Sequence, residues 1–195
     1  LALAITSVND APVGVADAVT TNEDTAATGN VLSNDTDVDD DTLSVTQFVW
    51  NGVTTAAGNT ATITGVGTLT IGVNGSYTFT PALNYHGAVP SATYTLSDGS
   101  LSTTSTLSIA ITSVNDAPVG VSDSVTTNED TSAIGNVLGN DTDVDGDTLS
   151  VTQFVWGSST TLAGGTATIT GVGTLTIGVN GSYTFTPALN YHGAV

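Results

Sequence analysis

The chain has 195 residues, of which 18 are acidic and none is lysine, arginine, cysteine or methionine, giving a formal net charge of −18. Without basic side chains it lacks the groups that bind phosphate, which excludes nucleic acid and anionic membrane surfaces as partners. No disulfide can form, and no apolar run approaches the roughly 18 residues of a membrane helix, so direct membrane insertion is not expected.

Strand signals are dense along the chain, and no stretch shows helical periodicity. In chain order, the runs with strand character are Val13–Val19, Leu43–Trp50, Thr60–Thr64, Leu69–Val73, Ser76–Pro81, Ala92–Leu96 and Leu107–Ile111. About seven short strands separated by turns predict an all-β fold, a β-sandwich of immunoglobulin or cadherin type.

The sequence GTLTIGV-NG-SYTFTP contains the clearest local element. Asn-Gly between two alternating runs is a strong hairpin signal. We expect the core to receive Leu69, Ile71 and Val73 from the first strand and Tyr77 and Phe79 from the second. Thr78 and Thr80 should face solvent.

The sequence repeats itself with a period of 106 residues. At that offset 76 of 89 comparable positions are identical, and the differences concentrate at Asn51–Asn59, which we interpret as an exposed loop. This period predicts a string of domains of about 100 residues. The expected boundaries are a closing strand of a preceding repeat (1–9), a first repeat (10–115) and a second repeat, incomplete at its C-terminal end (116–195).

The two ends of the sequence carry unmatched strands. Leu1–Val8 corresponds to Leu107–Val114, and the second copy lacks counterparts of Pro90–Val114. We expect the chain to be a window on a longer repetitive polypeptide, with Leu1–Val8 lying against strands outside the first copy. In the alternative, Leu1–Val8 of one chain inserts into the second copy of a neighbour, as in donor-strand filaments.

Fifteen of the 18 acids fall into three motifs that occur in both copies. Clustered carboxylates with no lysine or arginine nearby need another cation, and Ca²⁺ favours carboxylate and carbonyl oxygens. A solvated acidic loop that serves solubility is the alternative, while Mg²⁺ and Zn²⁺ suit this ligand set less well. The predicted ligands are Asp10 and Asp116 with Asn115, then Glu23, Asp24, Glu129 and Asp130, and finally the loop residues Asp35, Asp37, Asp39, Asp41, Asp141, Asp143, Asp145 and Asp147.

The motifs SVNDAPV, TTNEDT, GNVLxNDTDVDxDTLSVT, NYHG and YTLSDG together resemble the VCBS and cadherin-like tandem repeats of giant bacterial surface proteins, including RTX-type adhesins. The resemblance implies immunoglobulin-like domains in an extracellular extender, with calcium stiffening the domain junctions. By analogy, Asn115 and Asp116 would meet Glu129 and Asp130. Whether the loop Asp141–Asp147 forms the same site or a separate one stays open.

No constellation for catalysis is present, because each copy has a single histidine (His86, His192) without a placed nucleophile, so we do not expect an enzyme. Trp50 and Trp156 are either core residues or platforms for a sugar ring. The leading hypothesis is a spacer or fibre segment that projects an adhesive region or builds extracellular matrix, including biofilm, with neighbouring repeats as partners and glycans or other cell surfaces contacted by other domains. The alternatives are a carbohydrate-binding adhesion module, a subunit of a donor-strand filament and an accessory domain of a secreted enzyme.

Overall fold

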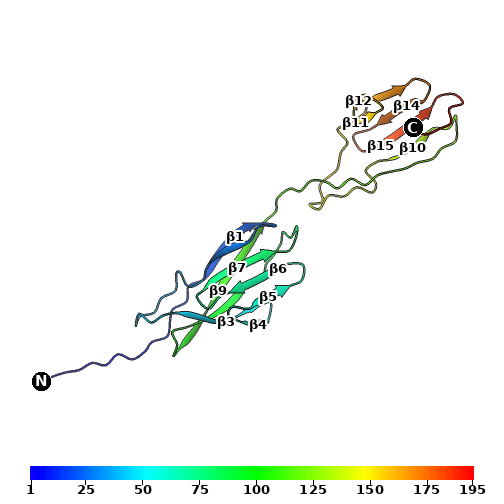
Figure 1. Ribbon diagram of the computed structural model, residues 1–195. Helices are drawn as coiled ribbons and strands as arrows, with labels where there is room; N and C mark the ends of the chain where they lie inside the picture. The colour runs from blue at the N-terminus through cyan, green and yellow to red at the C-terminus, as the bar shows by residue number, and fades with distance from the viewer. The chain divides into compact units, whose positions relative to one another are not determined.

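The computed structural model describes residues 1–195 and divides into two units, Leu1–Val114 and Asn115–Val195, which are described separately (Figure 1). All of its regular structure is β, in 15 strands, which confirms the predicted fold class. No helix long and apolar enough to cross a membrane occurs in it.

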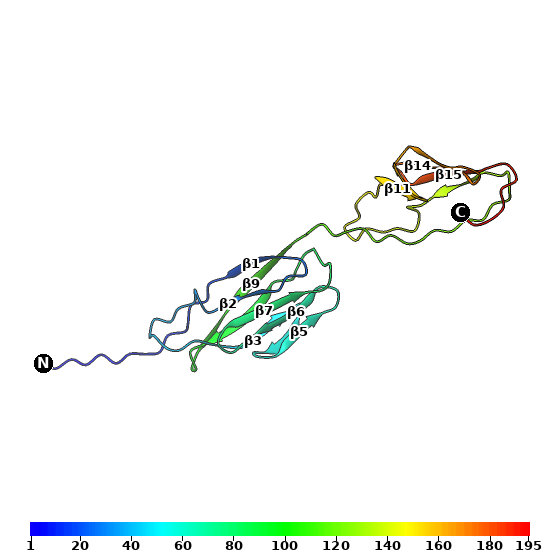
Figure 2. The ribbon, with the colours of Figure 1, turned by 45° about the horizontal axis from the view of Figure 1, so that its top comes forward.

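The larger sheet of unit 1 has five strands in the order β1-β9-β8-β3-β4. β1 and β9 run parallel and side by side, as both views show (Figures 1 and 2), while the other neighbours are antiparallel. The bounds of these strands are Asp17–Asn22 for β1, Ser44–Trp50 for β3, Val53–Ala56 for β4, Ala92–Ser97 for β8 and Ser102–Thr112 for β9.

The second sheet of unit 1 is antiparallel, in the order β2-β7-β6-β5. Its strands are β2 (Ala27–Asn30), β5 (Thr60–Ile63), β6 (Gly67–Ile71) and β7 (Ser76–Pro81). The predicted hairpin is confirmed: Leu69 pairs with Phe79 and Ile71 with Tyr77, and Gly75 takes a positive φ of 80° in the turn. Val73 was expected in the core and is exposed, because β6 ends at Ile71 and Val73 belongs to the turn.

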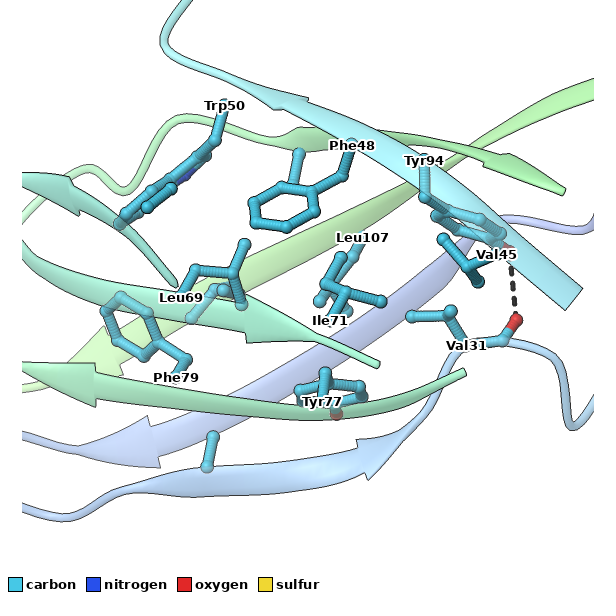
Figure 3. Packing of buried hydrophobic residues seen from close by; sticks show 14 of the residues in the cluster. Val31, Val45, Phe48, Trp50, Leu69, Ile71, Tyr77, Phe79, Tyr94 and Leu107 are labelled. Atoms are coloured by element: carbon cyan, nitrogen blue, oxygen red, sulfur yellow. Dashed lines mark hydrogen bonds between the residues drawn. The ribbon is translucent and has the colours of Figure 1, made fainter. Parts of the chain in front are cut away.

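The two sheets of unit 1 enclose one apolar core, shown in Figure 3. Trp50 is only 1% exposed; its ring stands edge-on to Phe79 at 6.0 Å, and its indole N–H donates to the carbonyl of Pro90 at 2.7 Å. Trp50 is therefore a core residue, and its ring is not available as a sugar platform.

The variable patch of the sequence is exposed but is not a loop throughout. Val53–Ala56 forms β4, which pairs with β3 through a tight turn in which Asn51 and Gly52 have positive φ. The alternation of apolar and polar residues did not indicate this strand, because β4 is an edge strand with exposed threonines and Val53 faces solvent.

Unit 2 repeats part of this architecture. A four-stranded sheet has the order β10-β15-β14-β13, and β11 and β12 form a separate hairpin. The strands are β10 (Ala133–Asn136), β11 (Gln153–Trp156), β12 (Ser159–Leu162), β13 (Thr166–Ile169), β14 (Gly173–Ile177) and β15 (Ser182–Pro187).

Two segments of unit 2 differ from their counterparts in unit 1 although their sequences nearly match. Residues 123–128 correspond to β1 and form no strand, because β1 pairs only with β9 and no counterpart of β9 lies within Asn115–Val195. The sequence SVTQFVW is a strand over all seven residues in β3, which pairs on both sides, but over only four in β11, which pairs on one.

The segment Leu1–Val8 forms no strand, and its large apolar side chains Leu1, Leu3 and Ile5 are exposed. It does not complete either sheet of unit 1.

Candidate metal-binding loops

The loop Asp35–Asp41 follows β2 and turns sharply on its own carboxylates. Asp37 Oδ1 accepts a hydrogen bond from the amide of Asp39 at 2.8 Å, and Asp40 has the positive φ of 61° that such a turn requires. In unit 2, Asp143 Oδ1 accepts from the amides of Asp145 and Asp147, and Gly146 takes the position of Asp40. Aspartate can adopt a left-handed conformation, so both copies make the same turn.

The Asn-Asp-Ala-Pro segment of each unit lies on the acidic loop of that same unit. In unit 1 the amide of Asp10 donates to Asp39 Oδ2 at 2.8 Å, and Ser7 Oγ donates to Asp39 Oδ1 at 3.0 Å. Val13 and Thr36 add a short antiparallel bridge. The entry segment of unit 1 is thereby held against the loop by one carboxylate and one backbone bridge.

Unit 2 repeats this arrangement. The amide of Asp116 donates to Asp145 Oδ2 at 2.7 Å, and Val119 forms a bridge with Thr142. Asn115 bonds locally to the carbonyl of Asp116, whereas its counterpart Asn9 also donates to Asp98 Oδ2 at 2.9 Å.

One carboxylate oxygen of the loop in unit 1 has no protein partner. Asp37 Oδ2 is buried and accepts no hydrogen bond. An open depression of about 600 Å³ lies beside it, lined among others by Asp35, Asp40 and Asp41. A buried carboxylate oxygen without a donor is unfavourable, and a hard cation would satisfy it. Within one unit, no three of the predicted acidic ligands have oxygens within 4.8 Å of one another, so cation binding requires the side chains to turn inward.

Asp35 has a structural role that the sequence did not indicate. Its Oδ1 accepts from the amide of Val15 at 2.6 Å, and its Oδ2 lies 3.0 Å from the hydroxyl of Tyr94. Asp141 likewise accepts from the amide of Val121 at 2.7 Å. Both oxygens of Asp35 are therefore used to fix the start of the β1 region and the core.

The hydroxyl of Tyr94 is surrounded by four acceptors: the carbonyls of Val15 and Val31 and the carboxylates of Asp17 and Asp35, at 2.9 to 3.3 Å. Figure 3 shows its bond to Val31. Burial raises the pKa of Tyr94 and also that of Asp17, so the tyrosine keeps its proton. Asp17 and Tyr94 were not predicted as polar partners, because in the sequence both belong to ordinary strand alternation.

The Asn-Glu-Asp turn lies at the other end of β1. The amide of Val114 donates to Glu23 Oε1, and the amide of Glu23 donates to the carbonyl of Thr112 at 3.0 Å. The Val114 N–H holds the pKa of Glu23 below its usual value. His86 Nδ1 lies 3.4 Å from Glu23 Oε2, and Asp24 accepts from the amide of Asn84 at 2.8 Å.

In unit 2 the same turn is open. The side chain of Glu129 is 55% exposed and 4.0 Å from His192, whereas that of Glu23 is 2% exposed; Asp130 accepts from the amide of Asn190. The expectation that Asn115 and Asp116 meet Glu129 and Asp130 stays a prediction. The amide of Asp116 donates to Asp145, and the segment 123–128, the counterpart of β1, lies between Asp116 and Glu129 in the sequence.

A family model described as bacterial cadherin-like domain matches the chain twice, over residues 9–113 and 115–195. No curated protein matches. Among solved structures, the titin domains z1z2 in complex with telethonin share 17% identity at a TM-score of 0.38, with 95% of this chain and 85% of that chain covered.

Two hydrolase-related structures are also similar. A nucleoside hydrolase-related hypothetical protein from Saccharophagus degradans shares 17% identity at a TM-score of 0.36, covering 53% of this chain and 26% of that one. An endo-fucoidan hydrolase from glycoside hydrolase family 107 shares 15% identity at a TM-score of 0.36, covering 92% and 24%. The chain thus spans about a quarter of the length of each.

Proposed function

Because this chain belongs to the bacterial cadherin-like domain family, an extracellular module that works in tandem with its neighbours, we propose that it is a calcium-stabilised extender of a large secreted bacterial surface protein. Its function is mechanical, since it holds an adhesive region at a distance from the cell or builds extracellular matrix. Domains of this fold are typically not enzymes.

The observation that carries this proposal is the hydrogen bond from the entry segment to the acidic loop, which occurs in both copies. Asp10 donates to Asp39 in unit 1, and Asp116 donates to Asp145 in unit 2. A cation on these carboxylates would fix not only the loop but also the segment through which the chain enters the domain. Near-identical copies favour a role in which length matters, because repetition supplies length.

We assign the calcium in unit 1 to Asp37 and Asp39, with Asp10 and Asp41 as further oxygen donors. Asp37 supplies the buried oxygen that lacks a partner, and Asp39 already contacts the entry segment. The corresponding set in unit 2 is Asp143, Asp145, Asp116 and Asp147. When bound, Ca²⁺ neutralises like charges that otherwise repel one another, since no lysine or arginine is present to do so.

The remaining predicted ligands fall outside this set. Asp35 and Asp141 hold backbone amides beside the start of their domains. Glu23, Asp24, Glu129 and Asp130 belong to the turn at the other end of β1 or of its counterpart, where a second cation site stays a prediction.

The test is to compare the chain in millimolar calcium and in chelator by thermal unfolding and small-angle X-ray scattering. Calcium that binds only the folded form raises the melting temperature by mass action. Calcium should also reduce the spread of chain dimensions that scattering reports, because the entry segments become fixed. Identical melting and scattering in both conditions would contradict the proposal.

A further inference from the structure

Three asparagines of the chain are each followed by a glycine, namely Asn51, Asn74 and Asn180. An asparagine in this position can react with its own backbone, because glycine has no side chain to hinder the approach of its nitrogen to the side-chain amide. The reaction requires that the side chain and the following peptide unit rotate toward each other. The structure allows this rotation at one of the three sites and restrains it at the other two.

The turn at Asn74 is held by four hydrogen bonds. Asn74 Oδ1 accepts from the Ser76 hydroxyl at 2.7 Å and from the Ser76 amide at 3.2 Å, which fixes the side chain. The amide of Gly75, which would have to attack, donates to the carbonyl of Gly72 at 2.9 Å, and Gly75 is buried. The side chain of Asn30 donates to the carbonyl of Asn74 at 3.0 Å. Both reacting groups of this site are therefore fixed in place.

Asn180 has the same protection in the second copy. Its Oδ1 accepts from the Ser182 hydroxyl at 2.7 Å and from the Ser182 amide at 3.1 Å. The amide of Gly181 donates to the carbonyl of Gly178 at 2.9 Å, and Asn136 donates to the carbonyl of Asn180 at 3.0 Å. Asn74 and Asn180 thus provide two internal references for a site without such bonds.

The turn at Asn51 has none of these restraints. Asn51 and Gly52 are exposed and have φ angles of 50° and 78°, as a two-residue hairpin turn between β3 and β4 requires. No hydrogen bond holds the Asn51 side chain or the Gly52 amide, and no atom beyond the neighbouring residues lies within 4 Å of the place of a Cβ on Gly52. β4 is a four-residue edge strand that pairs with β3 alone, so this hairpin opens more readily than the interior of the sheet.

From this contrast we infer that Asn51 is a site of spontaneous covalent modification, at which deamidation converts the asparagine into aspartate or isoaspartate. The backbone nitrogen of Gly52 attacks Cγ of Asn51, and the side-chain nitrogen leaves as ammonia, taking the proton of the Gly52 amide. The product is a cyclic imide in which the Gly52 nitrogen is bonded to both carbonyl carbons of Asn51. Water then breaks one of these two bonds, giving aspartate when the bond to Cγ breaks and isoaspartate when the bond to the backbone carbon breaks. Water is the only co-reactant, and nothing is oxidised or reduced.

The two products change the hairpin in different ways. Each adds one carboxylate to a chain of net charge −18. Isoaspartate also directs the backbone through Cβ and Cγ, which lengthens the two-residue turn that sets the pairing of Trp50 with Val53. The isoaspartyl form should therefore lose the register of β4 against β3, whereas aspartate tolerates the positive φ of this position and keeps it.

The second copy lacks this site. Gly157 and Ser158 stand where the first copy has Asn51 and Gly52. The modification thus distinguishes two copies that are otherwise nearly identical, and it does not depend on the calcium assignment.

The first experiment follows the folded chain during incubation at mildly alkaline pH. Cleavage after the two glutamates, Glu23 and Glu129, separates Asn51 and Asn74 from Asn180, and tandem mass spectrometry locates each converted residue. We expect conversion at Asn51 to be at least roughly tenfold faster than at either reference site, because the turns there must first break their hydrogen bonds. No conversion at Asn51, or equal rates at the three sites, overturns the inference.

The second experiment separates the effect of the fold from that of the local sequence. In urea that unfolds both units, the three sites should convert at similar rates, since each is an asparagine followed by glycine. A preference for Asn51 that persists in the unfolded chain would show that the fold does not select it and would overturn the inference.

The third experiment removes one restraint from the protected site in the first copy. Ser76→Ala deletes the hydroxyl that donates to Asn74 Oδ1 and should raise the rate of conversion at Asn74 several-fold in the folded chain. Thr78→Ala is the matched control, because Thr78 is also exposed on β7 and its side chain makes no bond to Asn74. Equal rates at Asn74 in the two variants would contradict protection by hydrogen bonding.

Discussion

Replacing Asp37 by asparagine distinguishes two roles of this residue, that of a calcium ligand and that of a structural acceptor for the backbone of the loop. Asparagine keeps the oxygen that accepts the amide of Asp39 at 2.8 Å, and it removes one negative charge from the loop. In chelator the free energy of unfolding of unit 1 should therefore change by no more than about 0.5 kcal/mol. In calcium the variant loses the ligand oxygen that has no other partner.

The magnitude follows from mass action. At free calcium a hundredfold above the dissociation constant, one site stabilises the folded form by about 2.7 kcal/mol. If Asp37→Asn weakens binding tenfold, about 1.4 kcal/mol of this remains at the same calcium concentration. The loss of about 1.3 kcal/mol corresponds to a fall in melting temperature of roughly 5–10 °C for a domain of about 100 residues.

The assay is thermal unfolding followed by tryptophan fluorescence in a Trp156→Phe background, where the buried Trp50 reports on unit 1 alone. Asp40→Gly is the matched control, because it removes one charge from the same loop and introduces the residue that unit 2 has at Gly146. It should leave the calcium-dependent stabilisation intact. A fall of the same size in chelator and calcium, or an equal effect of Asp40→Gly, would refute the assignment of Asp37.

Three further predictions concern the scaffold. The Val114 amide lowers the pKa of Glu23, so the contribution of Glu23 to stability is present above about pH 4.5 and is lost as the pH falls through its lower folded-state pKa. Glu23→Gln should therefore make the free energy of unfolding depend less on pH in the acid range, and Glu129→Gln, at the exposed counterpart, should have a smaller effect. Tyr94→Phe removes the hydroxyl that faces four acceptors and should lower the free energy of unfolding, measured by urea denaturation, by about 1–3 kcal/mol. An unchanged free energy of unfolding would mean that water replaces the hydroxyl. Gly67→Ala places a Cβ against the carbonyl of Thr80 and should lower the midpoint of urea unfolding more than Gly58→Ala, where no atom lies near the added Cβ. The reverse order would show that the backbone at Gly67 relaxes freely.

Local sequence patterns were sufficient for the elements that depend on near neighbours. The Asn74-Gly75 hairpin and its inward-facing Leu69 and Phe79 follow from alternation and one turn signal, and the structure has them. The turn at Asp40 also agrees with the local sequence, since the second copy has glycine there and aspartate tolerates the same conformation.

What the sequence could not supply depends on distant partners. SVTQFVW is a seven-residue strand in one copy and a four-residue strand in the other, because only the first has β8 beside it. For the same reason residues 123–128 are not a strand although their counterpart β1 is one.

The candidate site shows the same limit. Spacing alone grouped Asp35 with Asp37 and Asp39, but Asp35 faces Tyr94, which lies 59 residues away in the sequence. The family resemblance suggested that Asp116 meets Glu129, and it gave no indication that the amide of Asp116 donates to Asp145 of the acidic loop. The topology of the β-sandwich, and not the sequence motif, determines which carboxylates lie close together.

The central claim is that calcium binds the acidic loop and the entry segment together in each copy. The most direct measurement is a calcium titration of the isotope-labelled chain followed by amide chemical shifts in two-dimensional NMR. We predict saturable shifts concentrated at the amides of Asp10 and Asp39 in the first copy and of Asp116 and Asp145 in the second, where the amides of Asp10 and Asp116 donate to the loop carboxylates. Shifts that are absent, that do not saturate, or that leave these four amides unchanged would contradict it.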